Sequence, residues 1–230
     1  MCYSELDVIA SIHARHTANI INGLKLYEVR KDCPRLDFPF KCLIYCTKSD
    51  FKGKELVLAR SDSIIQKFGV TKHNTIFLKP DENHYSDPNV INPVLNGMVV
   101  GEFVCDSILT IYADQGGRSN YDVSQDTLKE MCLTQDELWA YANGQTLYAW
   151  HISNLTIYDN PKPISLYLKA CQDPYHYCQA CRFGHIVYPE SVECYQDLEG
   201  CSFEEYCTNI MTRAPQSWCY TQKALAGQVI

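Results

Sequence analysis

The 230-residue sequence lacks the features that would place it in a membrane or direct it out of the cell. No stretch approaches the roughly 20 consecutive apolar residues that a membrane-spanning helix needs. The opening residues, MCYSELDVIASI, do not combine a basic start with an apolar run of signal-peptide length. We therefore expect a cytoplasmic protein that makes no membrane contact.

The sequence also lacks an excess of positive charge, since 20 lysines and arginines face 27 acidic residues and the formal net charge is −7. This balance excludes a protein that coats nucleic acid non-specifically, because that mode requires a broad excess of basic residues. The charge is uneven, however. Residues 1–48 carry seven basic and five acidic residues, whereas residues 171–214 carry two basic and seven acidic ones. Any anion-binding site is therefore expected to be local and in the N-terminal part.

Glycine is sparse, with 11 residues, and internal repeats and low-complexity tracts are absent. Aromatic residues make up 12% of the chain and include 16 tyrosines, which is typical of a β-rich body rather than an all-helical one. At 46% hydrophobic content, 230 residues can bury one good core. We therefore expect a single domain over 1–230, with a lid or loop insertion at 49–96 and a cysteine-rich insertion at 171–211.

The N-terminal part predicts a strand, a short helix and two further strands. Residues 8–12 (VIASI) predict a strand, and the following ARHTANIIN carries apolar residues at helical spacing up to Gly23, a typical helix-ending residue. Residues 26–31 alternate as a strand should. Residues 41–48 (KCLIYCTK) are more apolar and predict a central strand.

The C-terminal half predicts more strands and one helix. Residues 98–112 (MVVGEFVCDSILTIY) predict one long strand, in which Gly101 marks a bulge or bend. A helix is predicted from Thr134, a capping residue followed by acidic residues, to Gly144. Further elements are expected at 61–70 (a short helix), 147–158 (a strand ended by Pro161 and Pro163) and 217–222 (the last strand).

Residues 23–30, GLKLYEVR, match the pattern G-x-K-x-x-E-x-R after a strand and a short helix. This pattern resembles the signature of ASCH domains, which belong to the PUA-like superfamily. The resemblance implies an α+β fold, a small PUA-like β-pseudobarrel of five to six strands with one or two packed helices. Further blocks that resemble barrel strands of bacterial and phage ASCH proteins are LIYCTK (43–48), VVGEFVCD (99–106), LYAWHISNLTIYDNPKP (147–163) and TRAPQSWCY (212–220).

The resemblance also implies a cleft lined by Lys25, Glu28 and Arg30 that binds RNA or a nucleotide. Lys25 and Arg30 can clamp a phosphate, the arginine through a two-pronged hydrogen bond and the lysine as a point charge. Glu28 can orient Arg30 or accept a hydrogen bond from a base amino group. The alternative is a surface ion pair, which stabilises a protein by about 0–1 kcal/mol.

Other residues in the matching blocks are candidates for nucleic-acid contact. A tryptophan or tyrosine exposed in the cleft would stack on a base. For Trp150 the alternative, and the favoured one, is that its ring fills the barrel core. The further candidates of this kind are Tyr45, Thr47, Lys48, Trp150, His151 and Trp218.

A hydrolase acting on RNA or on a modified nucleoside is a second hypothesis. It requires a nucleophile or an activated water beside a base, and the candidates are Lys25, Glu28, Thr47 and Ser217. The amidohydrolases among ASCH relatives carry a threonine inside the first motif near the lysine. Residues 25–28 read KLYE and contain no such threonine, so we favour a binding protein over an enzyme.

The cysteine-rich insertion predicts a structural zinc site. Cys178 and Cys181 form one close pair, and Cys201 and Cys207 form a second. Four thiolates in two pairs suit tetrahedral zinc, and a metal would stabilise a stretch too short and acidic to fold alone. The alternatives are a loop with reduced cysteines or a disulfide formed after purification. A third functional hypothesis assigns the acidic residues 171–214 to a protein partner or to nucleic-acid mimicry.

The remaining residues of metal-binding type are assigned to ordinary positions. His13 and His16 lie one helical turn apart without a carboxylate partner in pattern, and we expect them on the surface. Cysteines in apolar strand or helix contexts behave as small core residues. These are Cys42, Cys46, Cys105, Cys132 and Cys219.

Overall fold

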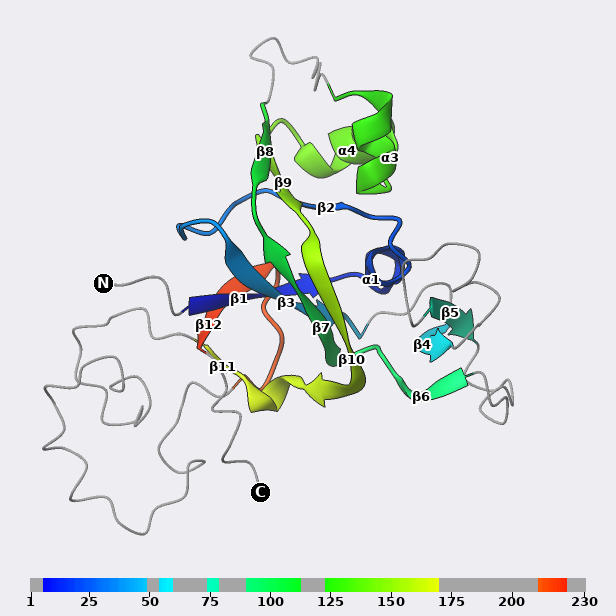
Figure 1. Cartoon of the computed structure of the whole chain (residues 1–230). Coiled ribbons are helices and arrows are strands. Elements are labelled where there is room, and N and C mark those ends of the chain that lie inside the picture. The colour runs from blue at the N-terminus through cyan, green and yellow to red at the C-terminus, as the bar shows by residue number, and fades with distance from the viewer. Residues whose placement is uncertain are drawn as a thin grey trace, which may run out of the picture.

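The computed structural model describes residues 6–48, 54–59, 74–78, 90–112, 123–169 and 211–222. Within these ranges the chain forms an α+β fold, as predicted, with one large and two small sheets (Figure 1). The large sheet has the strand order β10-β7-β3-β1-β12-β11. Its strands are β1 (Leu6–Ile12), β3 (Phe40–Cys46), β7 (Met98–Cys105), β10 (Ser153–Pro163), β11 (Leu168–Lys169) and β12 (Trp218–Gln222).

Strand β1 runs through the middle of this sheet, parallel to β3 and antiparallel to β12. Both of its faces are buried: Val8 and Ala10 belong to the main core, and Ile9 belongs to a second cluster on the other face. Such a strand reads as a continuous apolar run, because neither face meets water. This explains why residues 8–12 and the strand at 41–48 were the clearest strand predictions, and the structure confirms both.

Helix α1 (Ala14–Ile21) packs against the main core through Ala14, Ala18 and Ile21. The chain leaves the helix at Gly23, whose φ of 70° lies in the left-handed region that glycine adopts without strain. The helix and its end residue are as predicted. The turn that follows delivers the chain directly into β2 (Tyr27–Arg30).

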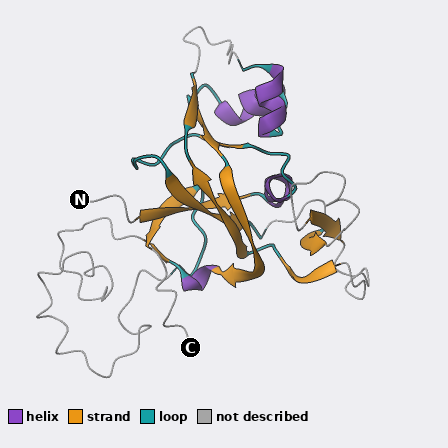
Figure 2. Ribbon diagram, in the orientation of Figure 1, coloured by secondary structure: helices purple, strands orange, loops and turns teal. Residues whose placement is uncertain are grey.

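A three-stranded sheet with the order β2-β9-β8 carries the other described α-helices (Figure 2). Strand β9 spans Leu147–His151 and β8 spans Ile108–Ile111. Helices α3 (Gln125–Met131) and α4 (Gln135–Ala142) bury Met131 and Leu138 in a small core shared with Val29 of β2. The predicted helix start is confirmed, since Thr134 and Glu137 form a capping box. Helix α3 was not predicted.

Two segments predicted as single strands are each divided between two sheets. Residues 98–112 break at Asp106 and Ser107 into β7 and β8, and residues 147–158 break at Ile152 into β9 and β10. The Asp106 carboxylate accepts a hydrogen bond from Ser107, the kind of local side-chain contact that favours a turn over a continued strand. Strand β10 also continues through Pro161 to Pro163. The strand thus ends at the second of the two prolines expected to end it, and it is an edge strand of its sheet, a position where proline is tolerated.

The segment 49–96, predicted as a lid or loop, contains a third sheet with the order β5-β4-β6. Its strands are short apolar runs that carried too few residues for a clear periodic signal. The short helix predicted at 61–70 lies outside the described residues. The strands are β4 (Glu55–Ala59), β5 (Asn74–Leu78) and β6 (Val90–Val94).

Gly101 lies where β7 is pressed against its neighbour β10. The register between β7 and β3 shifts next to Gly101, in agreement with the predicted irregularity. A Cβ atom at Gly101 would overlap the backbone oxygen of Thr156. Backbone atoms inside a ladder cannot give way alone, so a side chain at this position forces the two strands apart.

We therefore expect Gly101→Ala to lower the free energy of unfolding by about 1–3 kcal/mol, the usual cost of overpacking. Urea unfolding followed by circular dichroism measures this loss. Gly144→Asn is the matched control, since a Cβ at Gly144 meets nothing within 4 Å and asparagine tolerates its left-handed backbone. Equal stability of Gly101→Ala and the wild type would contradict the close contact.

Candidate functional site

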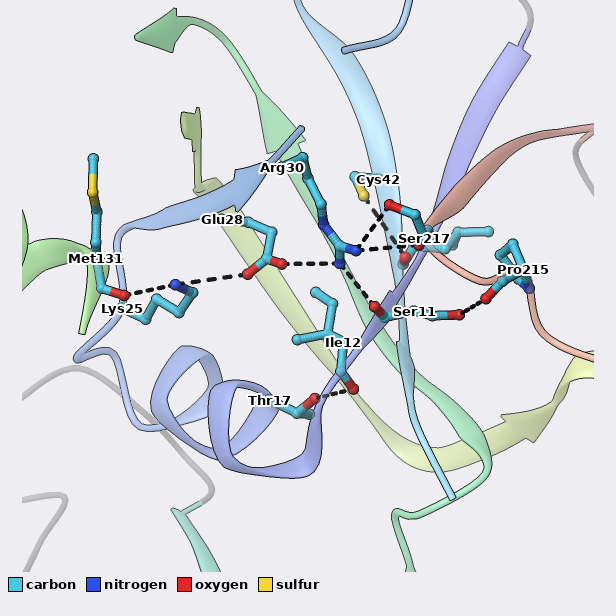
Figure 3. A network of polar contacts seen from close by, with 11 residues as sticks. Ser11, Ile12, Thr17, Lys25, Glu28, Arg30, Cys42, Met131, Pro215 and Ser217 are labelled. Atoms are coloured by element: carbon cyan, nitrogen blue, oxygen red, sulfur yellow. Dashed lines mark hydrogen bonds and ion pairs between the residues drawn. The ribbon is translucent and has the colours of Figure 1, made fainter. Parts of the chain in front are cut away.

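Lys25, Glu28 and Arg30 form one connected network of charges (Figure 3). Glu28 and Arg30 lie two residues apart on one face of β2, and Lys25 enters from the turn after α1. The Arg30 Nη2 atom lies 2.9 Å from Glu28 Oε1, and the Lys25 Nζ atom lies 3.8 Å from Glu28 Oε2. The structure thus brings together the three residues that the sequence predicted to share a site.

The network is buried, so the alternative of a surface ion pair is wrong. The three residues expose 2%, 5% and 6% of their surface, in chain order. Lys25 Nζ donates to the carbonyl oxygen of Met131, the last residue of α3, at 2.6 Å. Burial costs these charges their hydration, and the carbonyl and carboxylate partners offset that cost.

Arg30 connects three parts of the chain through its guanidinium group. Its Nη2 atom donates to the Ser11 carbonyl oxygen at 2.8 Å, and its Nη1 atom donates to the Ser217 carbonyl oxygen and Oγ, both at 3.3 Å. Ser11 lies on β1 and Ser217 directly precedes β12. One side chain of β2 therefore holds the central strand and the segment before the last strand in position.

The electrostatics of the network extend to His16 on α1. Burial lowers the pKa of Lys25, and the Glu28 carboxylate opposes that effect. Burial, followed by the positive charge of Lys25, lowers the pKa of His16 to about 4. His13 is exposed, as predicted, but His16 is partly buried and is not the surface histidine that was expected.

Four buried polar atoms in and beside this network have no hydrogen-bond partner among the described residues. They are Glu28 Oε2, Arg30 Nε, His16 Nδ1 and Trp150 Nε1. Glu28 and Trp150 are register partners on β2 and β9, so their side chains share one face of that sheet. The interior beside the network therefore keeps unused hydrogen-bonding capacity.

Two pockets formed by described residues open beside the segment 211–220. The first has a volume of about 570 Å³, and we call it the aromatic pocket. Three rings and two lysine ammonium groups contribute to it, and the Lys31 ammonium lies 5.4 Å from the centre of the Tyr141 ring. Its lining residues are Lys31, Asp32, Tyr141, Lys169, Ser217, Trp218, Cys219 and Tyr220.

The second pocket has a volume of about 400 Å³, and we call it the basic pocket. Its charged lining residues are Lys48 and Arg213, and no acidic residue is among the described residues that line it. It lies at the end of β3, where the chain leaves the large sheet. Its lining residues are Ser11, Tyr45, Thr47, Lys48, Gly97, Pro163, Ile164, Thr212, Arg213, Ala214, Pro215 and Gln216.

The predicted ligand-contacting residues divide among these places. Tyr45, Thr47 and Lys48 line the basic pocket, and Trp218 lines the aromatic pocket. Lys25, Glu28 and Arg30 line neither pocket, so their direct contact with a ligand stays a prediction. The Trp150 ring is fully buried in the main core, in agreement with the favoured alternative that it fills the core and does not stack on a base. His151 pairs with Asp106 at 2.7 Å and lines neither pocket.

The candidate catalytic residues are not gathered at one point. Lys25 and Glu28 belong to the buried network, and Thr47 lines the basic pocket. Ser217 Oγ accepts a hydrogen bond from Arg30 and lines the aromatic pocket. This arrangement supplies no nucleophile paired with a base among these four residues.

Lys31, Tyr141, Lys169 and Arg213 were missed by the sequence analysis. Lys31 directly follows Arg30 of the motif, and this adjacency is the one sequence feature that could have indicated its place beside the site. Tyr141 comes from α4, and Lys169 and Arg213 come from late segments of the chain. Nothing in their local sequence indicates that they meet Lys31 or Lys48.

The predicted metal site and the predicted lack of membrane contact are compared with the described residues as follows. The predicted zinc ligands Cys178, Cys181, Cys201 and Cys207, and most of the acidic segment 171–214, lie outside the described residues, so both stay predictions. Among the residues that are described, no cluster of three histidine, cysteine or acidic side chains suits a metal ion. Nor does this part of the chain contain a helix long and apolar enough to span a membrane.

Comparison with known proteins gives a fold resemblance. No family model and no curated protein matches the chain. Among solved structures, it is similar to the ASCH protein of Zymomonas mobilis, with a TM-score of 0.38 and 13% identity over 69% of this chain and 73% of that chain. A tyrosine-to-phenylalanine variant of that protein gives the same TM-score and identity, with 76% of its chain covered.

Proposed function

We propose that this protein is an RNA-binding module that holds a nucleotide of single-stranded RNA in the aromatic pocket. The observation that carries the proposal is the combination, in one pocket of about 570 Å³, of aromatic rings with two lysines. Single-stranded nucleic acid is bound through this combination, because rings stack on bases and cations contact the backbone. The pocket volume lies in the range of small-ligand sites.

The rings are held in place before any ligand arrives. The Trp218 ring lies edge-on against the buried Trp150 ring, with centres 5.8 Å apart, and against the Tyr220 ring at 5.4 Å. A ring that packs against the core loses little freedom on binding, which lowers the entropic cost of stacking. We infer that Trp218 and Tyr141 contact the base, and that Lys31 and Lys169 contact the phosphates.

In this proposal the buried network supports the pocket. Arg30 donates to both the carbonyl oxygen and the hydroxyl of Ser217, which lines the aromatic pocket beside Trp218. Lys31 follows Arg30 in the chain and reaches the same pocket. The motif residues therefore position the groups that meet the ligand, and Lys25, Glu28 and Arg30 need no contact with it.

Truncation of the exposed ring tests the proposal. Tyr141→Ala is expected to weaken binding of fluorescein-labelled octauridylate by about 1–3 kcal/mol, roughly 5- to 150-fold in Kd, because one base loses its stacking partner. Tyr141→Phe retains the ring and is expected to bind as the wild type does. Fluorescence anisotropy at fixed salt measures both.

Charge removal gives a second readout at the same pocket. Lys31→Ala is expected to lower the slope of log K against log salt by about 0.7, the value for one phosphate contact to a single strand. Lys129→Ala is the control, since Lys129 is 77% exposed on α3 and lines neither pocket. If Tyr141→Ala and Lys31→Ala both bind octauridylate as tightly as Lys129→Ala, the proposal is wrong.

A further inference from the structure

The basic pocket carries two positive charges in a chain whose formal net charge is −7. Lys48 and Arg213 are both exposed, and neither forms an ion pair with any carboxylate of the described residues. Cations without carboxylate partners, on an acidic protein, produce a local field that attracts an anion. The described residues that line the basic pocket therefore carry a larger excess of positive charge than those of the aromatic pocket, where Asp32 opposes the two lysines.

Because Gly97 has no side chain, the aliphatic part of Lys48 can pack against its backbone. A Cβ atom at Gly97 would lie 3.1 Å from Lys48 Cγ and 3.4 Å from Lys48 Cε, so the aliphatic part of Lys48 lies across this glycine. A hydrogen bond fixes the turn at Gly97, because the Gly97 N–H donates to the Cys46 carbonyl oxygen at 2.8 Å. The stem is therefore packed while the ammonium group remains exposed at the pocket.

The segment 211–217 contributes to both pockets, residues 212–216 to the basic pocket and Ser217 to the aromatic pocket, and it is anchored along its length. The Met211 N–H donates to the Tyr167 carbonyl oxygen at 2.9 Å. Ser11 Oγ donates to the Pro215 carbonyl oxygen at 2.6 Å, and the Ser11 N–H donates to the Ser217 carbonyl oxygen at 2.8 Å. The two pockets therefore lie on one rigid element, with fixed spacing between them.

That spacing suits a short piece of single-stranded nucleic acid. From Arg213 to Trp218 the chain can span at most about 18 Å. A stacked strand carries one phosphate per roughly 3.4 Å, so about five nucleotides or fewer reach from one pocket to the other.

We infer that the basic pocket is a second subsite, where Lys48 and Arg213 bind a backbone phosphate of the same RNA strand whose base lies in the aromatic pocket. The ligand is then an oligonucleotide rather than a mononucleotide, and it crosses the segment 211–217. The Arg213 guanidinium contacts two phosphate oxygens, and the Lys48 ammonium adds a point charge. This inference rests on the proposed function of the aromatic pocket.

Length dependence and charge removal together test the inference. Wild-type affinity for oligouridylates is expected to rise with length and to level off at about six nucleotides. Near 0.15 M salt, Lys48→Ala and Arg213→Ala are each expected to weaken octauridylate binding roughly fourfold, and the double variant about 15-fold, with a salt slope lower by about 0.7 per contact. Uridine monophosphate, whose binding is followed by quenching of tryptophan fluorescence, is expected to bind all variants equally.

The outcomes separate this inference from the proposed function. Lys48→Arg keeps the charge and is expected to bind octauridylate nearly as the wild type does. If Tyr141→Ala weakens binding but the Lys48→Ala, Arg213→Ala double variant does not, the aromatic pocket stands and the second subsite is wrong. If the double variant weakens monophosphate and octauridylate equally, the two-subsite arrangement is also wrong. If the wild type binds neither probe, both proposals fail.

Discussion

Replacing Arg30 by methionine is expected to lower the free energy of unfolding by about 3–5 kcal/mol. Methionine is similar in length but carries no charge, so Glu28 loses its 2.9 Å partner while it remains buried. Lys25, at 3.8 Å, is left as the only cation paired with it among the described residues. The carbonyl groups of Ser11 and Ser217 lose a donor as well. Urea unfolding followed by fluorescence measures the loss.

Two further variants identify the cause of that loss. Lys129→Met removes an exposed lysine and is expected to change the free energy of unfolding by less than about 0.5 kcal/mol. The triple variant Lys25→Met, Glu28→Leu, Arg30→Met removes every charge of the network and is expected to regain much of the lost stability, because no unpaired charge stays buried. A loss below about 1 kcal/mol in Arg30→Met would show that water replaces the missing partner.

The Arg30 variant also links stability to the proposed function. Because Arg30 holds Ser217, its removal is expected to disturb the aromatic pocket although Arg30 does not line it. The spacing G-x-K-x-x-E-x-R then describes how β2 is tied to β1 and to the segment before β12. In the proposed function, the ligand is contacted by residues outside the pattern, such as Lys31 of the aromatic pocket.

Local patterns were sufficient for the elements that form the centre of the fold. Apolar runs predicted β1 and β3, and helical spacing with Gly23 predicted α1 and its end. The period of β2 placed Glu28 and Arg30 on one face, and the structure confirms this. These predictions succeeded because each depends on residues that are neighbours in the sequence.

The burial of the network could not be predicted in the same way. A period of two shows which side chains share a face, but not what covers that face. The cover is supplied by Met131 and Ser217, which are 106 residues from Lys25 and 187 residues from Arg30. The same reason explains why the two pockets were missed, since both depend on the segment 211–220 returning to β1.

The breaks between β7 and β8 and between β9 and β10 were not predicted, for a different physical reason. Each of the segments 98–112 and 147–158 is mostly apolar, and the few polar residues inside them, such as Asp106 and Ser153, do not show that the two halves join different sheets. The break at Asp106 depends on side-chain contacts, including the 2.7 Å contact between Asp106 Oδ1 and His151 Nδ1, which joins the two break points. Such a contact exists only after β8 and β9 have paired.

Acidification is expected to destabilise the protein through His16. Its pKa is about 4 in the folded protein, against 6.5 without the fold, because burial and Lys25 oppose the charged form while Glu28 favours it. Between these values the unfolded chain binds one more proton than the folded protein, so stability is retained above pH 6.5 and lost as the pH falls towards 4. From pH 7 to pH 4.5 the loss from this one group is about 2 kcal/mol.

The neighbouring histidine provides a matched comparison for that prediction. His16→Asn removes the titrating group, so its free energy of unfolding is expected to fall by about 2 kcal/mol less than that of the wild type over the same pH change. His13→Asn changes the exposed histidine at the N-cap of α1 and is expected to follow the wild type. Carboxylates with lowered pKa, such as Glu102 and Glu137, are common to all three proteins, so their effect cancels in the difference. Parallel pH profiles for His16→Asn and the wild type would mean that His16 is hydrated in the folded protein, and that the polar interior around Lys25 and Glu28 is open to water.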